Sequence, residues 1–256
     1  MRTILPRFLL VALSVLSSQP ASAIVGYYNT LMQPGVNLVA NQLNTSDNSI
    51  NSVLTPNYPL LDGATFTKWN GGSFLTPSIY DATTDSWSIN YSLNLGEGGY
   101  LTTPTLFTNT FVGEVVLYPP LGLTPWTPNY ADGLHLISSP LPIAGNLNST
   151  FGGDTMFEIV VGRTPVDGEG VAILDPTTQT YSFHVYMFGG WFDENLNSSA
   201  AILSVGHAAW FALGADLELG ANQASFGIPV VPEPTAVSLL LASGIALMAM
   251  RNKVLR

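Results

Sequence analysis

Strict alternation of apolar and polar residues marks the clearest predicted element of the chain. Residues 86–95 alternate serine and asparagine with five large apolar side chains: Trp87, Ile89, Tyr91, Leu93 and Leu95. Because successive side chains of a β-strand point to opposite faces, this pattern predicts a strand with one buried face. Residues 181–188 form a second run of strand type.

Turn signals separate these runs. Asp62-Gly63, Asn70-Gly71-Gly72 and Asp167-Gly168 are combinations that favour tight turns. No long helical period precedes the last 26 residues. The pattern predicts an all-β fold with antiparallel, sandwich-like sheets.

Four short segments recur in the same order along the chain, which predicts two related β-modules, residues 24–118 and 119–230. The matched pairs are 35–40 with 133–138, 63–66 with 153–156, 95–101 with 205–211, and 110–113 with 225–228. The proline-rich residues 119–128 form the joint, since proline does not fit a central strand. The modules are either independent sandwiches or halves of one larger sandwich. Closely packed halves are favoured if Leu121, Leu123 and Trp126 are covered.

The N-terminus has the three parts of a secretory signal. Arg2 and Arg7 are basic, residues 8–16 are apolar, and Ala21-Ser22-Ala23 provides small residues for cleavage after Ala23. The apolar run is shorter than the roughly 20 residues of a membrane span. The sequence therefore predicts a signal peptide at residues 1–23 and export through the Sec machinery.

The C-terminal residues 231–256 also have three parts. Val231-Pro232-Glu233-Pro234 comes first, an uncharged apolar run covers residues 235–250, and Arg251, Lys253 and Arg256 end the chain. Two prolines disfavour a helix in the first part. The apolar run would form a helix of roughly 24 Å, against a hydrocarbon core of about 30 Å. We expect this helix to enter the membrane at least transiently, with its basic end in the cytoplasm.

This tail resembles the PEP-CTERM sorting tail of exported bacterial proteins, over residues 231–256 only. The resemblance implies cleavage near Pro232, Glu233 and Pro234 by an exosortase-type protease. It also implies release to the cell surface or extracellular matrix of a Gram-negative-type envelope and association with exopolysaccharide. The alternative is an ordinary anchor that is retained, in which case the mature protein ends at Arg256.

Positive charge is concentrated in the two ends. Of the seven lysines and arginines, only Lys68 and Arg163 lie within residues 24–230, beside sixteen acidic residues, so this region has a net charge of −14. Phosphate binding needs clustered lysine and arginine, so nucleic acid is excluded as a partner. The chain has no cysteine, which excludes disulfides and thiolate metal sites.

Residues suited to catalysis are present but are not arranged in a recognisable pattern. His135, His184 and His207 are far apart in the sequence, and no serine has the Gly-x-Ser-x-Gly spacing of a hydrolase nucleophile. Polysaccharide cleavage needs a pair of carboxylates. The candidate acids are Glu97, Glu114, Glu158, Asp193 and Glu194. Nothing in the sequence pairs them, and we expect no enzymatic activity.

Two ligand hypotheses remain open. Oxygen-rich residues 81–85, 167–169 and 193–195 could bind calcium, but none has EF-hand or nonapeptide spacing, and ordinary Asx turns are the preferred explanation. Otherwise we expect no cofactor. Trp191, between Gly190 and Phe192, is predicted to be exposed and to stack on a sugar ring. The sequence thus predicts a secreted surface or matrix protein with a structural or adhesive role, the alternative being a carbohydrate-binding module or weak polysaccharide hydrolase.

Overall fold

The computed structural model describes residues 24–54, 61–116, 128, 130–199 and 201–214. These residues form several antiparallel sheets and two short helices, so the predicted all-β class is confirmed. The signal peptide with Ala21 and Ala23, most of the proline-rich joint, and the tail with Val231, Pro232, Glu233, Pro234, Arg251, Lys253 and Arg256 lie outside the described residues.

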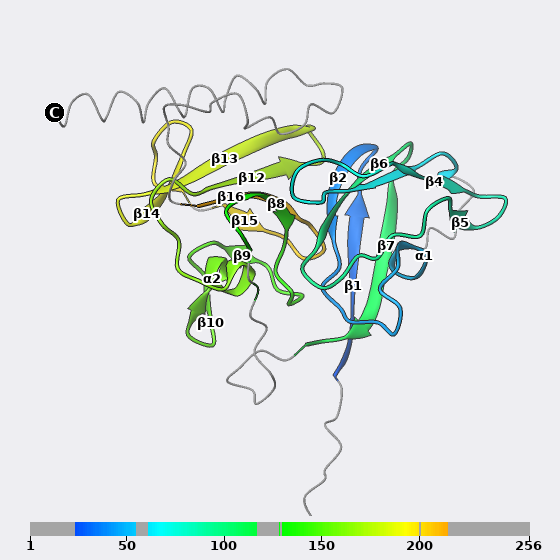
Figure 1. Cartoon of the computed structure of the whole chain (residues 1–256), viewed down its shortest axis with the longest axis horizontal. Helices are drawn as coiled ribbons and strands as arrows, with labels where there is room; N and C mark the ends of the chain where they lie inside the picture. Colours follow the sequence, from blue (N-terminus) through cyan, green and yellow to red (C-terminus); the bar gives the residue numbers. More distant parts are fainter. Residues whose placement is uncertain (1–23, 55–60, 117–127, 129, 200, 215–256) are drawn as a thin grey trace, which may run out of the picture.

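The first five-stranded sheet has the order β2-β6-β3-β4-β5. Its strands are β2 (Gly35–Ala40), β3 (Thr65–Lys68), β4 (Ser78–Asp81), β5 (Ser86–Trp87) and β6 (Gly98–Thr103), and α1 (Ile50–Val53) lies between β2 and β3 in the chain. A separate ribbon pairs β1 (Val25–Met32) with β7 (Phe107–Glu114). Figure 1 shows these elements in the right half of the molecule.

The second five-stranded sheet has the order β14-β13-β12-β16-β8. Its strands are β8 (Gly133–Ile137), β12 (Gly170–Asp175), β13 (Thr180–Met187), β14 (Gly190–Asp193) and β16 (Ala209–Leu213). Two short pairs accompany it, β9 (Gly145–Asn146) with β15 (Ile202–Leu203) and β10 (Thr150–Phe151) with β11 (Asp154–Thr155). With α2 (Met156–Val161), these elements occupy the left half of Figure 1.

Both sheets have the same strand order and register. In each, the first strand along the chain is at an edge, the fifth is next to it, and the second, third and fourth follow. Leu38 pairs with Tyr100 in the first sheet, and Leu136 pairs with Trp210 in the second. These are the residues that the matches of 35–40 with 133–138 and of 95–101 with 205–211 align.

The match of residues 63–66 with 153–156 is wrong in structural terms, because residues 63–66 lead into β3 whereas residues 153–156 cover β11 and the start of α2. The counterpart of the Asp62-Gly63 turn is Asp167-Gly168. The Gly63 amide donates to the Tyr80 carbonyl (3.0 Å), and the Gly168 amide donates to the Tyr186 carbonyl (2.8 Å). Residues 225–228 of the fourth match lie outside the described residues.

Alternation along the strands gives each sheet two buried faces. Val39, Phe66 and Leu101 point into the first core cluster, beneath the β1–β7 ribbon. Ile137 and Phe211 point into the second core cluster, which α2 covers. The opposite faces meet in a shared cluster: Leu38, Ala40, Tyr100, Leu136, Ala172, Leu174, Ala208 and Trp210. The two sheets therefore pack against each other through this shared cluster.

Backbone bridges near the strand ends also join the two halves, and they occur in matching pairs. Val39 bridges His207, and Ile137 bridges Glu97. The Ala40 amide donates to the Gly206 carbonyl (3.0 Å), while the Ser138 amide donates to the Gly96 carbonyl (2.9 Å). Contacts of residue i with j that recur as j with i are typical of a two-fold interface.

The strand predicted over residues 86–95 is largely wrong. Only Ser86–Trp87 forms β5, and its antiparallel partner β4 begins at Ser78, so the strand has no partner further along the chain. The Ile89 amide donates to the Ser78 hydroxyl (2.9 Å), and the Leu93 amide donates a hydrogen bond to the Asn48 carbonyl (2.7 Å), far away in the sequence. The Ser88 amide still donates to the Ile79 carbonyl of β4 (2.8 Å), and the segment leaves the sheet beyond this residue. The second predicted run is confirmed as β13.

Candidate functional site

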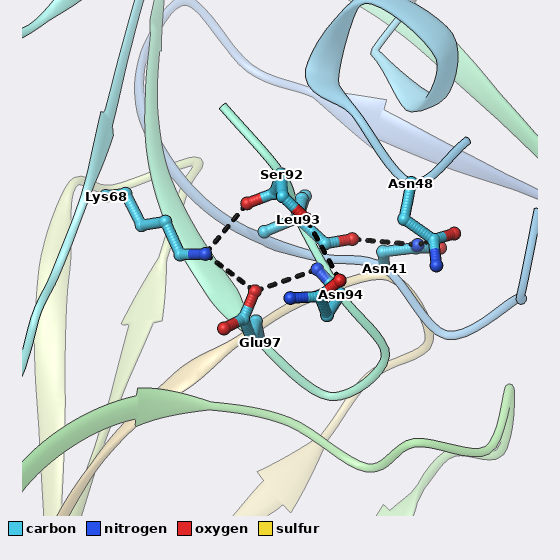
Figure 2. A network of polar contacts seen from close by, with 7 residues as sticks. All are labelled: Asn41, Asn48, Lys68, Ser92, Leu93, Asn94 and Glu97. Atoms are coloured by element: carbon cyan, nitrogen blue, oxygen red, sulfur yellow. Dashed lines mark hydrogen bonds and ion pairs between the residues drawn. The ribbon is translucent and has the colours of Figure 1, made fainter. Parts of the chain in front are cut away.

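An ion pair and its polar surroundings form a connected polar site at the surface of the first half (Figure 2). Lys68, at the end of β3, places its Nζ 2.7 Å from Oε2 of Glu97, just before β6. The same ammonium donates to the Ser92 carbonyl at 2.8 Å. The Lys68 side chain is 17% exposed and that of Glu97 36%. The pair is therefore at the surface but partly desolvated.

The loop of residues 92–97 closes around the Glu97 carboxylate. The Asn94 amide donates to Glu97 Oε2 (2.8 Å), and the buried Asn41 side chain donates to the Leu93 carbonyl (2.9 Å) and to Asn48 Oδ1 (3.2 Å). Figure 2 shows these groups converging from three separate parts of the chain. Each charge has a partner, so the network anchors the loop.

The second ion pair joins a buried carboxylate to a partly exposed arginine. Glu169, fully inaccessible to solvent, accepts hydrogen bonds from both terminal nitrogens of Arg163, from the Val166 amide (2.9 Å) and from the Gly214 amide (3.0 Å). The hydrogen bond with Glu169 raises the pKa of Arg163. Among the described residues, Lys68 and Arg163 are the only lysine and arginine, and both are paired with a carboxylate.

The second half has a cavity of about 100 Å³. Its lining is mostly apolar: Ile173, Leu174, Pro176, Ile202, Leu203, Ser204, His207 and Ala208. Burial lowers the pKa of His207, so its imidazole is neutral at pH 7.

The three histidines lie on separate elements. His135, on β8, contacts the Ala131 carbonyl through Nε2 (2.7 Å), and His184, on β13, contacts the Ser199 carbonyl through Nδ1 (3.3 Å). His207 precedes β16 and lines the cavity. The structure therefore does not bring the three histidines together into one site.

The candidate acids are also dispersed. Glu97 is in the ion pair, Glu158 caps α2, and Glu114 ends β7. Asp193 Oδ1 accepts the amides of the two asparagines at positions 195 and 197 (both 2.9 Å), and this lowers its pKa; Glu194 is in the same loop. These roles place the acids in different local structures.

Acidic residues of the proposed calcium loops already have hydrogen-bond partners. Asp81 Oδ1 accepts the Thr83 amide (2.7 Å), Asp85 Oδ1 accepts the Tyr80 hydroxyl (2.5 Å), and Glu169 is paired with Arg163. In the part of the chain that the structure describes, no three His, Asp or Glu residues are grouped so that they could hold a metal ion.

Trp191 is not exposed, contrary to the sequence prediction. It is 2% exposed, pairs with Tyr186 across the β13–β14 hairpin, and its ring lies 5.5 Å from Phe157 of α2. The pair Trp87 and Tyr80 has the same arrangement in the first sheet, with ring centroids 5.5 Å apart against 5.3 Å for Trp191 and Tyr186. Strand alternation turns Trp191 into the second core cluster, and we withdraw it as a glycan contact.

The outer face of the β1–β7 ribbon carries exposed apolar side chains that sequence reasoning missed. Tyr27 is 76% exposed and is paired with the exposed Val112, and Val25 is exposed two residues before it. On the same face the Thr110 hydroxyl donates to Asn29 Oδ1 (2.8 Å). Exposure alternates along residues 25–32, but the sequence there does not alternate apolar with polar residues, so it carries no signal for this face.

Comparisons of the chain with protein-family models, curated proteins and solved structures gave no match. Within the described residues, no helix combines the length and apolar character needed to cross a membrane. Function must therefore be argued from the residues themselves.

Proposed function

We propose that the protein is exported, sorted through residues 231–256, and delivered to the cell surface or extracellular matrix, where it has a structural or adhesive role. The observation that carries this proposal is the order of the tail: Val231-Pro232-Glu233-Pro234, an apolar run, and the basic Arg251, Lys253 and Arg256. The Sec machinery and an exosortase-type protease are its processing partners, and exopolysaccharide is its associate in the matrix.

The adhesive part of the proposal is supported by the β1–β7 ribbon. Its outer face exposes Val25, Tyr27, Leu31 and Val112 together. Clustered exposed apolar side chains mark surfaces that bind partners more often than surfaces that face only solvent.

The proposal includes two related β-modules, residues 24–118 and 119–230. Their relation is supported by the common strand order, by the aligned pairs Leu38–Tyr100 and Leu136–Trp210, and by the reciprocal bridges. Modules joined through a shared apolar cluster form one rigid unit, which suits a structural role.

The test of sorting is the intact mass of the protein recovered from the cell surface and the medium. We expect an N-terminus near Ile24 and a C-terminus close to Val231–Pro234. A variant with Pro232 and Pro234 replaced by alanine should accumulate uncut in the membrane. Recovery of wild-type protein that ends at Arg256 would show that the tail is a retained anchor.

A second candidate function is binding of a neutral glycan by the β1–β7 ribbon, favoured by the exposed Tyr27 beside Asn29 and Thr110. An aromatic ring with adjacent hydrogen-bonding groups suits a sugar ring. Lys68 and Arg163 are both paired, which disfavours anionic glycans. On an array of neutral and acidic glycans, Tyr27→Ala should lose binding while Tyr27→Phe retains it. Equal binding by both variants would exclude this surface.

A further inference from the structure

The cavity beside His207 is the counterpart of the place that the Lys68–Glu97 ion pair fills in the first half. Thr67 pairs with Tyr100 on β6, and Ala172 pairs with Trp210 on β16. Lys68 is the residue after Thr67, and Ile173 is the residue after Ala172. Tyr100 and Trp210 occupy corresponding positions on β6 and β16, so Lys68 corresponds to Ile173.

Glu97 and His207 correspond in the same way. Each lies just before the fifth strand of its sheet and bridges the first strand of the other half, Glu97 with Ile137 and His207 with Val39. The loops before them have the same hydrogen bond, from the Glu97 amide to Asn94 (3.0 Å) and from the His207 amide to the Ser204 carbonyl (3.2 Å). The backbones of the two places therefore agree, and the side chains differ.

The replacement of the Lys68–Glu97 pair by Ile173 and His207 explains the cavity. Isoleucine is shorter than lysine, and the imidazole of His207 cannot make an ion pair with it, so about 100 Å³ stays open between β12 and the loop of residues 202–208. Leu174, Leu203 and Ala208 are buried and give it an apolar wall. Ile202 is exposed at its rim.

The lining also defines the chemistry of an occupant. Among the described residues, no lysine, arginine or carboxylate lines the cavity, so these residues offer a charged ligand no partner to offset its desolvation. His207 makes no side-chain hydrogen bond with the described residues, and as a neutral imidazole it both donates and accepts. Benzene, with six heavy atoms, binds in a cavity of about 150 Å³, so this one suits a ligand of roughly four to five heavy atoms.

We propose that this cavity binds a small neutral alcohol, with its carbon atoms against Leu174, Leu203 and Ala208 and its hydroxyl group hydrogen-bonded to the His207 imidazole. The site is independent of the sorting proposal and of the β1–β7 face. A hydroxyl group on a larger molecule can reach it in the same way, because the cavity is open at Ile202.

The test is an NMR titration of the whole purified protein with tert-butanol, observed through the imidazole protons of its three histidines. We expect a saturable shift of the His207 signals with a dissociation constant on the order of 1–10 mM. His135 and His184 are internal controls and should not shift. The isosteric cation tert-butylammonium should not bind, because the described lining of the cavity contains no carboxylate.

Two variants separate the hydrogen bond from the apolar space. His207→Ala should weaken tert-butanol binding about two- to tenfold, the usual range for one hydrogen bond, measured by ligand-observed saturation transfer. Ile173→Phe should fill the cavity and abolish binding, with unchanged near-ultraviolet circular dichroism as the folding control. Absence of a saturable His207 shift in the wild-type protein up to about 100 mM, or equal binding of tert-butylammonium, would overturn the proposal.

Discussion

Gln179 joins the two halves through a single side chain. Its Oε1 accepts the Val36 amide (2.8 Å) and its Nε2 donates to the Val36 carbonyl (3.0 Å), so the side-chain amide replaces a strand at the edge of β2. Its backbone is left-handed, with φ of 56°, which directs the side chain across the interface. One residue of the second half thereby satisfies both backbone groups of a residue in the first.

We predict that Gln179→Ala lowers the free energy of unfolding by about 1–3 kcal/mol, because it removes the partners of two backbone groups. Urea unfolding measures this loss. The matched control is Thr177→Ala in the same turn, which should change stability by less than about 0.5 kcal/mol. Equal stability of the two variants would mean that the Gln179 amide contributes nothing to joining the halves.

His207 makes stability depend on pH near neutrality. Burial lowers its pKa below the ordinary value of 6.5, so the unfolded chain binds the proton more tightly than the folded protein. Stability is therefore full above pH 6.5 and falls as the pH drops through the folded pKa. His207→Gln should remove this part of the pH dependence, measured as the difference between wild-type and variant unfolding curves from pH 7.5 to about 5. Parallel curves would contradict the assignment.

Trp191 shows what the sequence could not reveal about a single residue. Its neighbours Gly190 and Phe192 suggest an exposed hairpin, and nothing local indicates burial. The ring that covers it, Phe157, is 34 positions earlier and belongs to α2. Burial of an aromatic side chain thus depended on a distant element that the sequence analysis did not predict.

At the scale of elements, α2 has local signals for both ends. The Thr155 hydroxyl accepts the Glu158 amide (3.2 Å), the Glu158 carboxylate accepts the Thr155 amide (2.7 Å), and Gly162 ends the helix with φ of 86°. This capping box is visible in the sequence as Thr-x-x-Glu before an apolar run. A helix of only six residues has fewer than two turns. Its apolar residues therefore do not show a helical period in the sequence.

Thr155→Ala should destabilise the protein by about 1 kcal/mol, since a helix N-cap contributes roughly 0.5–2 kcal/mol. The cost reaches the whole fold because α2 buries five of its six side chains. Thr155→Ser keeps the hydroxyl and should be nearly neutral. Thermal unfolding of both variants is the measurement, and an equal loss in both would attribute the effect to the threonine methyl group.

Strand prediction succeeded where a partner strand continued and failed where it ended. β13 is paired on both sides, with β12 and with β14, and the run of residues 181–188 follows it closely. Residues 88–95 alternate just as regularly, but β4 begins at Ser78 and offers no partner to most of them. Alternation reports which side chains are buried, whereas a strand also requires a neighbour with free backbone groups.

At the scale of the whole molecule, the two sheets differ mainly in how they fill equivalent places. Lys68 and Glu97 form an ion pair in the first half, and Ile173 and His207 leave a cavity in the second. The sequence match of residues 95–101 with 205–211 already aligned Glu97 with His207. The counterpart of Lys68 could not be found, because the loops between corresponding strands have different lengths and the correct alignment appears only in the sheet register.

If the halves are related modules, the ion pair should be transferable. Ile173→Lys alone places an ammonium group beside a neutral imidazole, and His207→Glu alone leaves a carboxylate without a cation, so each should be destabilising by about 1–3 kcal/mol. The double variant restores both partners on the same backbone. A double-mutant cycle from urea unfolding should therefore give a favourable coupling of about 1 kcal/mol or more. Additive losses would mean that the two places are not structurally equivalent, and would weaken the case that the halves are related.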